Sequence, residues 1–206
     1  MLRKILATFL ILFVFASIGF LFWQQELQYI LPTPIPADYK IVPVNEVLSI
    51  NDSSLTPQHK PRFYHFFKPT CPCSRFNVKY FNILRRNYES QVDFIVVLPE
   101  GSDYQEALDY FDKDQVLTID QDMRLAHEFG VYSTPQAVIV TADQKLYYRG
   151  NYNKARYCTD PGSNFAQMAM DSLIQHRQAP DFGLLSTVSY GCGLPNEDFN
   201  IWTLNL

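Results

Sequence analysis

The chain has no excess of basic charge, few cysteines and no repeated or low-complexity segment. Its 206 residues include 17 Lys and Arg and 21 Asp and Glu, which gives a formal net charge of −4. Proteins that follow nucleic-acid phosphates carry a basic stripe, so we expect no nucleic-acid partner. Four cysteines are too few for a disulfide-scaffold miniprotein, whereas 16 Phe and 13 Tyr can fill a sizeable core.

The motifs of several enzyme classes are also missing. The sequence holds no Gly-rich phosphate loop, no Ser-His-Asp order with supporting context and no carboxylate pair placed for acid–base catalysis. Chemistry is therefore sought in the cysteines, two of which stand one residue apart.

One long apolar run lies near the N-terminus. Ile5–Trp23 is interrupted only by one Thr, one Ser and one Gly. As a helix it would measure about 28 Å, close to the roughly 30 Å hydrocarbon core of a bilayer. Arg3 and Lys4 precede the run and the next basic residue is Lys40, so the positive-inside rule predicts a single-pass signal-anchor. A cleaved signal peptide is the alternative.

This orientation leaves the N-terminus in the cytoplasm. The protein would sit in the inner (plasma) membrane, contacting lipid through residues 5–23, with an extracytoplasmic or periplasmic globular domain. We divide the chain into an anchor (1–23), a Pro-containing tether (24–57), a globular domain (58–178) and a tail (179–206). Pro32, Pro34 and Pro36 favour an extended tether, and Ile41–Val44 is a possible extra strand.

Strand and helix patterns alternate along the domain. Aromatic and β-branched runs predict strands, and apolar residues three or four apart predict helices. The expected strands are 62–68, 92–98, 116–119, 136–140 and 145–149, and the expected helices are 73–88, 103–111, 122–129 and 163–175. Gly130 is expected to end one helix and Ser163 to cap another. This order indicates an α/β fold with a central mixed sheet flanked by helices.

Cys71, Pro72 and Cys73 stand where a strand ends and a helix begins. Proline suits the first helical position, which makes Cys71 the cap residue. Backbone N–H groups and the helix dipole would then favour its thiolate, so we expect a reactive nucleophile. Cys73 would be its resolving partner. A static disulfide or two buried thiols is the structural alternative.

The strand–Cys–helix unit resembles the thioredoxin-like superfamily. The segment from Leu125 to Pro135, which ends in Tyr-Ser-Thr-Pro before a strand, supports this resemblance over about residues 58–178. It extends to membrane-anchored bacterial proteins of uncharacterised activity with a Cys-Pro-Cys centre. The resemblance implies a thioredoxin-like fold, a cis bond between Thr134 and Pro135 that faces the cysteines, and substrate binding by these two residues.

The same resemblance suggests a role for His65. It lies six residues before Cys71, at a position where thioredoxins hold a buried proton-relaying carboxylate. An unperturbed pKa near 6.5 would suit an acid–base group. A core histidine bonded to the backbone is the alternative.

The spacing of the cysteines departs from the family pattern, which has two residues between them. Residues two apart on a helix point about 200° away from each other, so a Cys71–Cys73 bond needs Cys71 bent back. We expect Cys71 to pair with Cys73, and Cys158 with Cys192, which would staple the tail to the domain. Pairing of Cys71 with a distant cysteine stays open, as does a second redox pair that relays electrons.

The expected function is thiol–disulfide exchange on a protein substrate, with a redox partner and no organic cofactor. The alternatives are a copper- or zinc-handling protein, a peroxidase and a binding module without turnover.

Overall fold

The computed structural model describes residues 2–23, 31–50, 59–155 and 158–194. The predicted tether at 24–30 and 51–58 and the tail beyond 194 lie outside these residues. The strands are β1 (Arg62–Phe66), β2 (Asp93–Pro99), β3 (Val116–Asp120), β4 (Ser133–Thr134), β5 (Gln136–Val140), β6 (Leu146–Gly150) and β7 (Cys192–Gly193). The α-helices are α1 (Leu2–Phe22), α3 (Pro72–Tyr88), α4 (Tyr104–Leu108), α5 (Arg124–Phe129), α6 (Phe165–Ile174) and α7 (Leu184–Thr187), with 3-10 turns at Gln121–Met123 and Pro161–Ser163.

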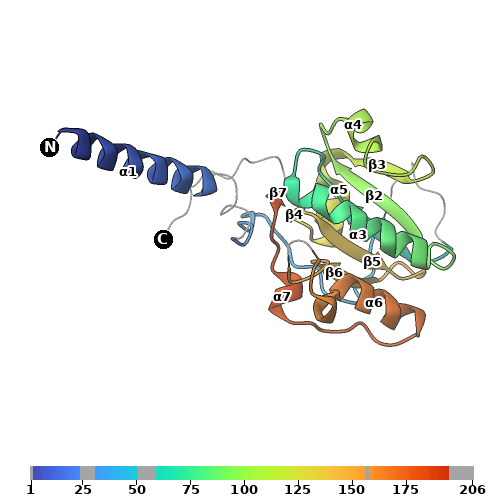
Figure 1. Cartoon of the computed structure of the whole chain (residues 1–206). Coiled ribbons are helices and arrows are strands. Elements are labelled where there is room, and N and C mark those ends of the chain that lie inside the picture. The colour runs from blue at the N-terminus through green and yellow to red at the C-terminus, as the bar shows by residue number, and fades with distance from the viewer. Residues whose placement is uncertain (1, 24–30, 51–58, 156–157, 195–206) are drawn as a thin grey trace.

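Five strands form one mixed sheet in the order β3-β2-β1-β5-β6 (Figure 1). β1 runs parallel to β2, and β2 to β3, whereas β5 is antiparallel to both β1 and β6. The predicted mixed sheet with flanking helices is therefore confirmed, and the fold is thioredoxin-like. β4 and β7 form a separate two-stranded sheet.

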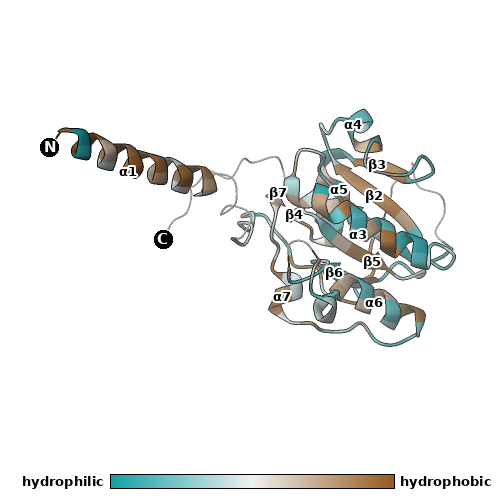
Figure 2. Ribbon diagram, in the orientation of Figure 1, coloured by the Kyte–Doolittle hydropathy of each residue, from teal (hydrophilic) through white to brown (hydrophobic). Residues whose placement is uncertain are grey.

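The sheet is buried on both faces, which explains its nearly continuous apolar strands (Figure 2). On one face, Phe63 of β1 packs with residues of α3, α4 and α6. On the other, Tyr64 and Phe66 pack with residues of α5. Side chains alternate across a strand, so β1 supplies both cores. β1 is also the central strand of the sheet, and the chain that leaves it leads to Cys71.

α1 is long and apolar enough to cross a membrane. Its 21 residues include no buried one, and at 1.5 Å per residue they span about 32 Å. Figure 2 shows the apolar colour along nearly all of this helix. The structure thus provides the helix that an anchor requires.

Residues 31–50 pack against the domain. The N–H of Thr33 donates to the carbonyl of Ser189 at 2.8 Å, and Leu48 is 2% exposed in the core beside α5. The possible strand at Ile41–Val44 does not form. Instead Val47 forms an isolated antiparallel bridge with Lys145, where backbone bonds join residues 45–48 to Gln144 and Leu146.

Most predicted elements form, with shifted ends. Gly130 ends α5 in the left-handed conformation, as expected. Asn164 holds the N-cap position of α6 without a side-chain capping bond, and Ser163 ends a preceding 3-10 turn. The expected cap at Ser163 was wrong because its hydroxyl bonds Asn153 and Asp160. The pattern gave no prediction of β4, α7 or β7.

Candidate active site

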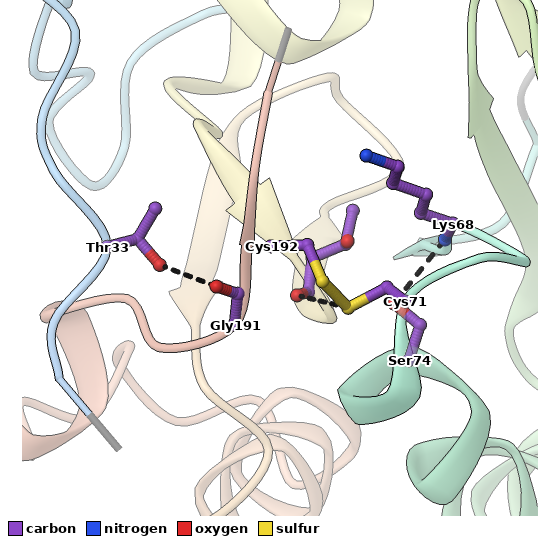
Figure 3. The surroundings of a disulfide bond; sticks show 7 residues. Thr33, Lys68, Cys71, Ser74, Gly191 and Cys192 are labelled. Carbon is purple, nitrogen blue, oxygen red and sulfur yellow. Dashed lines mark hydrogen bonds between the residues drawn. A yellow bond between two sulfur atoms is a disulfide. The ribbon is translucent and has the colours of Figure 1, made fainter. Parts of the chain in front are cut away.

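The start of α3 is built as the sequence predicts. Cys71 is the N-cap residue with extended φ and ψ of −87° and 117°, and Pro72 occupies the first helical turn. The N–H of Cys71 donates to the carbonyl of Lys68 at 3.0 Å, which turns the chain tightly after β1. Ser74 accepts a bond from the Lys68 N–H through its hydroxyl (Figure 3). These bonds fix the Cys71 sulfur at the end of the helix where N–H groups lack intrahelical partners.

A cis peptide bond between Thr134 and Pro135 faces this sulfur. The Cys71 Sγ lies 3.7 Å from the carbonyl oxygen of Thr134. Ser133 and Thr134, which form β4, are completely buried. The cis bond and its approach to Cys71 agree with what the thioredoxin-like resemblance implies; substrate binding there stays a prediction.

Cys71 is disulfide-bonded to Cys192, with Cα atoms 6.1 Å apart and a sequence separation of 121. The preferred pairings, Cys71 with Cys73 and Cys158 with Cys192, were wrong: Cys73 and Cys158 are not in disulfides. The alternative of a distant partner for Cys71 is the one that the structure takes. Figure 3 shows the tail strand passing between Thr33 and Cys71, with Cys192 reaching across to the helix start.

Pairing with the tail explains the choice of partner. β7 is antiparallel to β4, with Ser133 opposite Gly193 and Thr134 opposite Cys192. This register places Cys192 beside the carbonyl that Cys71 approaches. Cys73, in contrast, lies within the first turn of α3, so its side chain leaves the helix in a different direction from that of the cap residue.

Cys73 lines a cavity of about 300 Å³. Asn77, Pro135, Tyr152, Cys158 and Tyr190 also line it. The side-chain amide of Asn77 donates to the Cys158 Sγ at 3.5 Å. Burial raises the pKa of the Cys158 thiol to about 12, and this hydrogen bond opposes the rise only in part. The cavity therefore holds two thiols, of which Cys158 is poorly nucleophilic at neutral pH.

His65 is fully buried among aromatic rings. It stacks on Phe81 with ring centroids 4.6 Å apart, and its Nδ1 lies 2.7 Å from the hydroxyl of Tyr152. Burial lowers its pKa from the ordinary 6.5 to about 3, so the imidazole is neutral at physiological pH. These surroundings favour the core-histidine interpretation, although the hydrogen bond is to Tyr152 rather than to the backbone. His65 reaches the cavity only through Tyr152.

The tail is the part of the site that the sequence left unplaced. Ser189 is completely buried, and Leu194 is 4% exposed within the core beside α5. The Leu194 N–H donates to the carbonyl of Tyr132 at 2.9 Å. The signal was the segment Gly191-Cys192-Gly193-Leu194, in which small residues flank a cysteine and precede an apolar one.

A metal centre finds no support in the described ranges. Within residues 2–23, 31–50, 59–155 and 158–194, no three His, Cys, Asp or Glu side chains gather closely enough to hold an ion. The four-cysteine zinc alternative fails because the disulfide occupies Cys71 and Cys192.

The chain is similar at low sequence identity to several solved structures. A hypothetical protein of Sinorhizobium meliloti has a TM-score of 0.61 at 11% identity, over 79% of this chain and 98% of its own. An uncharacterised conserved protein of Geobacillus kaustophilus has a TM-score of 0.56 at 18% identity, over 80% and 91%. A secreted disulfide oxidoreductase of Mycobacterium tuberculosis, homologous to DsbE of Escherichia coli, has a TM-score of 0.42 at 17% identity, over 58% and 84%.

No curated protein matches the sequence. A family model matches residues 44–193, a range that includes all four cysteines and the β7 strand. The chain therefore belongs to the family described as a domain of unknown function, DUF6436.

Proposed function

We propose that the protein is a membrane-anchored, extracytoplasmic thiol–disulfide oxidoreductase whose reactive bond is Cys71–Cys192. The observation that carries this proposal is the position of one sulfur. Cys71 lies at the N-terminus of a 17-residue helix, beside a cis-proline segment, and in a disulfide with a partly exposed cysteine. Such a bond can be opened from the Cys192 side.

The two sulfurs differ in what they offer an attacking thiolate. Cys71 is 1% exposed, whereas Cys192 is partly exposed. Attack on the Cys192 sulfur expels the Cys71 sulfur as a thiolate, which the N–H groups at the helix start stabilise. A leaving thiol of lower pKa departs faster. We therefore expect a donor thiolate to attack the Cys192 sulfur in preference to the Cys71 sulfur.

The exchange begins with reduction of the Cys71–Cys192 bond by a donor protein. A thiolate of a donor protein dithiol attacks Cys192, the Cys71–Cys192 bond breaks, and the electron pair stays on the Cys71 sulfur. The second donor thiolate then attacks its partner sulfur and releases Cys192, so that the donor is oxidised to a disulfide and the protein holds two thiols. Cys71 next attacks a substrate disulfide, and Cys192 attacks Cys71 to release the reduced substrate. Cys73 is the second candidate for this resolving step.

The compartment follows from the anchor and the chemistry together. The apolar helix Leu2–Phe22 carries Arg3 and Lys4 at its start, which favours a cytoplasmic N-terminus and an exported domain. Disulfides persist and cycle outside the cytoplasm. We therefore place the domain on the extracytoplasmic side of the inner membrane.

Trapping tests this proposal. The double variant Cys73→Ser/Cys192→Ser keeps Cys71 but lacks both resolving candidates. We expect it to accumulate mixed disulfides with partner proteins in the membranes of an expressing bacterium, detected on non-reducing gels and identified by mass spectrometry. The matched control adds Cys71→Ser and should show none. If the two variants give the same pattern, Cys71 is not a nucleophile and the proposal fails.

A purely structural disulfide is the second candidate. Cys71 is almost fully buried, and its bond joins residues 121 apart, as in a staple that restricts the unfolded chain. The domain would then be a binding module without turnover. This candidate predicts no mixed disulfides in the trapping variant.

A further inference from the structure

The tail strand lies on β4 in the manner of a bound peptide. Its contacts are the disulfide from Cys71, the pairing of Thr134 with Cys192 and of Ser133 with Gly193, and the bond from the Leu194 N–H to Tyr132. Main-chain pairing of this kind holds an extended segment whatever its sequence, and side-chain fit then selects among segments.

We propose that β4 is a peptide-binding edge whose built-in occupant is the tail, and that it accepts extended segments of the form Gly-Cys-x-Leu from partner proteins. This inference rests on the proposed function and names its substrate class. The partner's cysteine takes the place of Cys192 against Cys71, in a mixed disulfide. The tail leaves when the Cys71–Cys192 bond is reduced.

The close approach of β4 restricts which residue can precede the cysteine. Gly191 has a φ of +139°, and a Cβ built on it would lie 2.1 Å from the carbonyl oxygen of Thr134 and 3.0 Å from its carbonyl carbon. Both atoms belong to the buried backbone of β4, which cannot move away as a flexible side chain can. An occupant in this register therefore needs glycine at that position.

The residue after the cysteine is not selected in this way. A Cβ on Gly193 would meet only the methyl group of Thr33, at an ordinary distance of 3.7 Å. The next position is apolar by burial, because Leu194 is 4% exposed in the core with Phe66 and Ala126. The edge thus demands glycine, cysteine, an unrestricted residue and a large apolar residue in that order.

The site lies close to the membrane along the chain. Thr33 bonds the tail from its other side, through its N–H to Ser189 and its hydroxyl to Gly191 at 3.4 Å. Ten residues lie between Phe22 and Thr33 in the chain, and this segment, fully extended, reaches at most about 40 Å. Partner segments are therefore extracytoplasmic ones that approach the bilayer.

Competition between tail and peptide gives the test. The full-length trapping variant Cys73→Ser/Cys192→Ser is reacted with peptides whose cysteine carries a thionitrobenzoate leaving group, and release of the coloured thiol gives the rate. Cys71 attacks the peptide sulfur, a protein–peptide disulfide forms, and thionitrobenzoate leaves with the electron pair. The peptides are Ser-Tyr-Gly-Cys-Gly-Leu-Pro, the same with Ala before the cysteine, and the same with Ala after it.

We expect the peptide with Ala before the cysteine to react at least about tenfold more slowly than the other two, since a clash that costs 1.4 kcal/mol or more is a factor of ten. The tail competes equally with all three peptides, so the ratio of rates holds even where the tail slows every reaction. Adding Gly191→Ala to the trapping variant should loosen the tail and speed the parent peptide. Gly193→Ala is the matched control and should leave that rate unchanged.

Glutathione carrying the same leaving group separates two failures. If Cys71 reacts with the glutathione probe but shows no preference among the peptides, the peptide-binding edge is overturned and the proposed function survives. If Cys71 reacts with neither probe, the proposed function itself fails. A variant with Gly191→Ala that does not fold is replaced by the peptide ratios alone, which need no change in the tail.

Discussion

The two cysteines of the Cys-Pro-Cys segment have one residue between them and different partners. Cys71 is at the helix cap, 3.7 Å from the carbonyl of Thr134 and bonded to a partly exposed tail cysteine. Cys73 shares a cavity with Cys158, whose thiol pKa is raised by burial. Cys71 and Cys73 are 1% and 3% exposed, so they differ in what each sulfur contacts and not in exposure.

This difference shows that the surroundings of a cysteine determine whether its sulfur can take part in disulfide exchange. Exchange needs a thiolate, a line of approach and a leaving group. The start of α3 supplies N–H groups and a partly exposed partner cysteine to Cys71, whereas burial raises the pKa of the Cys158 thiol and so disfavours its thiolate.

The largest effect is expected in alkylation of the fully reduced protein. Because the Cys158 pKa is about 12, its thiolate fraction at neutral pH is about a thousandfold below that of an ordinary thiol. We expect Cys71 to react with iodoacetamide at least that much faster, with the Cys73→Ser variant used to assign the modified residue by mass spectrometry. The Cys158 rate should rise about tenfold per pH unit and keep rising toward pH 12.

The Cys71 rate should level off at or below the pKa of an ordinary thiol. A Cys71 that reacts as slowly as Cys158 would remove the contrast and, with it, the reason to call Cys71 the nucleophile.

Loss of the disulfide comes next. Cys71 and Cys192 close a loop of 121 residues, so Cys192→Ser should lower the free energy of unfolding by about 2–5 kcal/mol. Denaturant unfolding under oxidising conditions measures this loss. Cys158→Ser is the matched control, and wild type treated with reductant should resemble Cys192→Ser. Equal stability of all four samples would show that the bond constrains nothing.

The hydrogen bond between His65 and Tyr152 should contribute measurably to the free energy of unfolding. His65→Phe leaves the Tyr152 hydroxyl buried without that partner and should cost about 1–3 kcal/mol at neutral pH. The double variant with Tyr152→Phe should recover most of this loss.

The pH dependence has a definite sign. The folded-state pKa of His65 is about 3, below the ordinary 6.5, so the unfolded chain binds more protons between these values. Wild-type stability should therefore fall relative to His65→Phe as pH drops from 6.5 toward 3, by about 1 kcal/mol per unit. A constant difference between the two unfolding curves would contradict the neutral, buried imidazole.

Local patterns predicted most of the fold because local physics decides it. The aromatic run of β1, the apolar spacing of α3, and Gly130 after α5 each signal their element without knowledge of the rest of the chain. The cap position of Cys71 follows from Pro72 in the same way. The cap of α6 was mispredicted because the Ser163 hydroxyl donates to Asn153 and Asp160 instead of capping the helix.

The pairing of the cysteines was not predictable from the same signals. It depends on β7 lying against β4, a contact between residues almost sixty positions apart, and two residues are too few for a strand pattern. His65 illustrates the same limit: its pKa is set by rings such as Phe81 and Tyr152 from other elements. Four cysteines allow three pairings, and only the tertiary arrangement selects among them.

The smallest effect is expected for a substitution at Thr33, which bonds the tail from the membrane-proximal segment. Thr33→Val removes the hydroxyl that donates to the Gly191 carbonyl but keeps the N–H bond to Ser189 and the side-chain volume. A long, partly buried hydrogen bond contributes at most about 1 kcal/mol, so in a glutathione redox buffer the Cys71–Cys192 bond should open at an equilibrium shifted by less than about fivefold toward the thiols. Thr33→Ser, which keeps the hydroxyl, should titrate as wild type does. A shift well beyond fivefold would mean that Thr33, and not β4, holds the tail against Cys71, and the reactivity of Cys71 would then depend on the membrane-proximal segment.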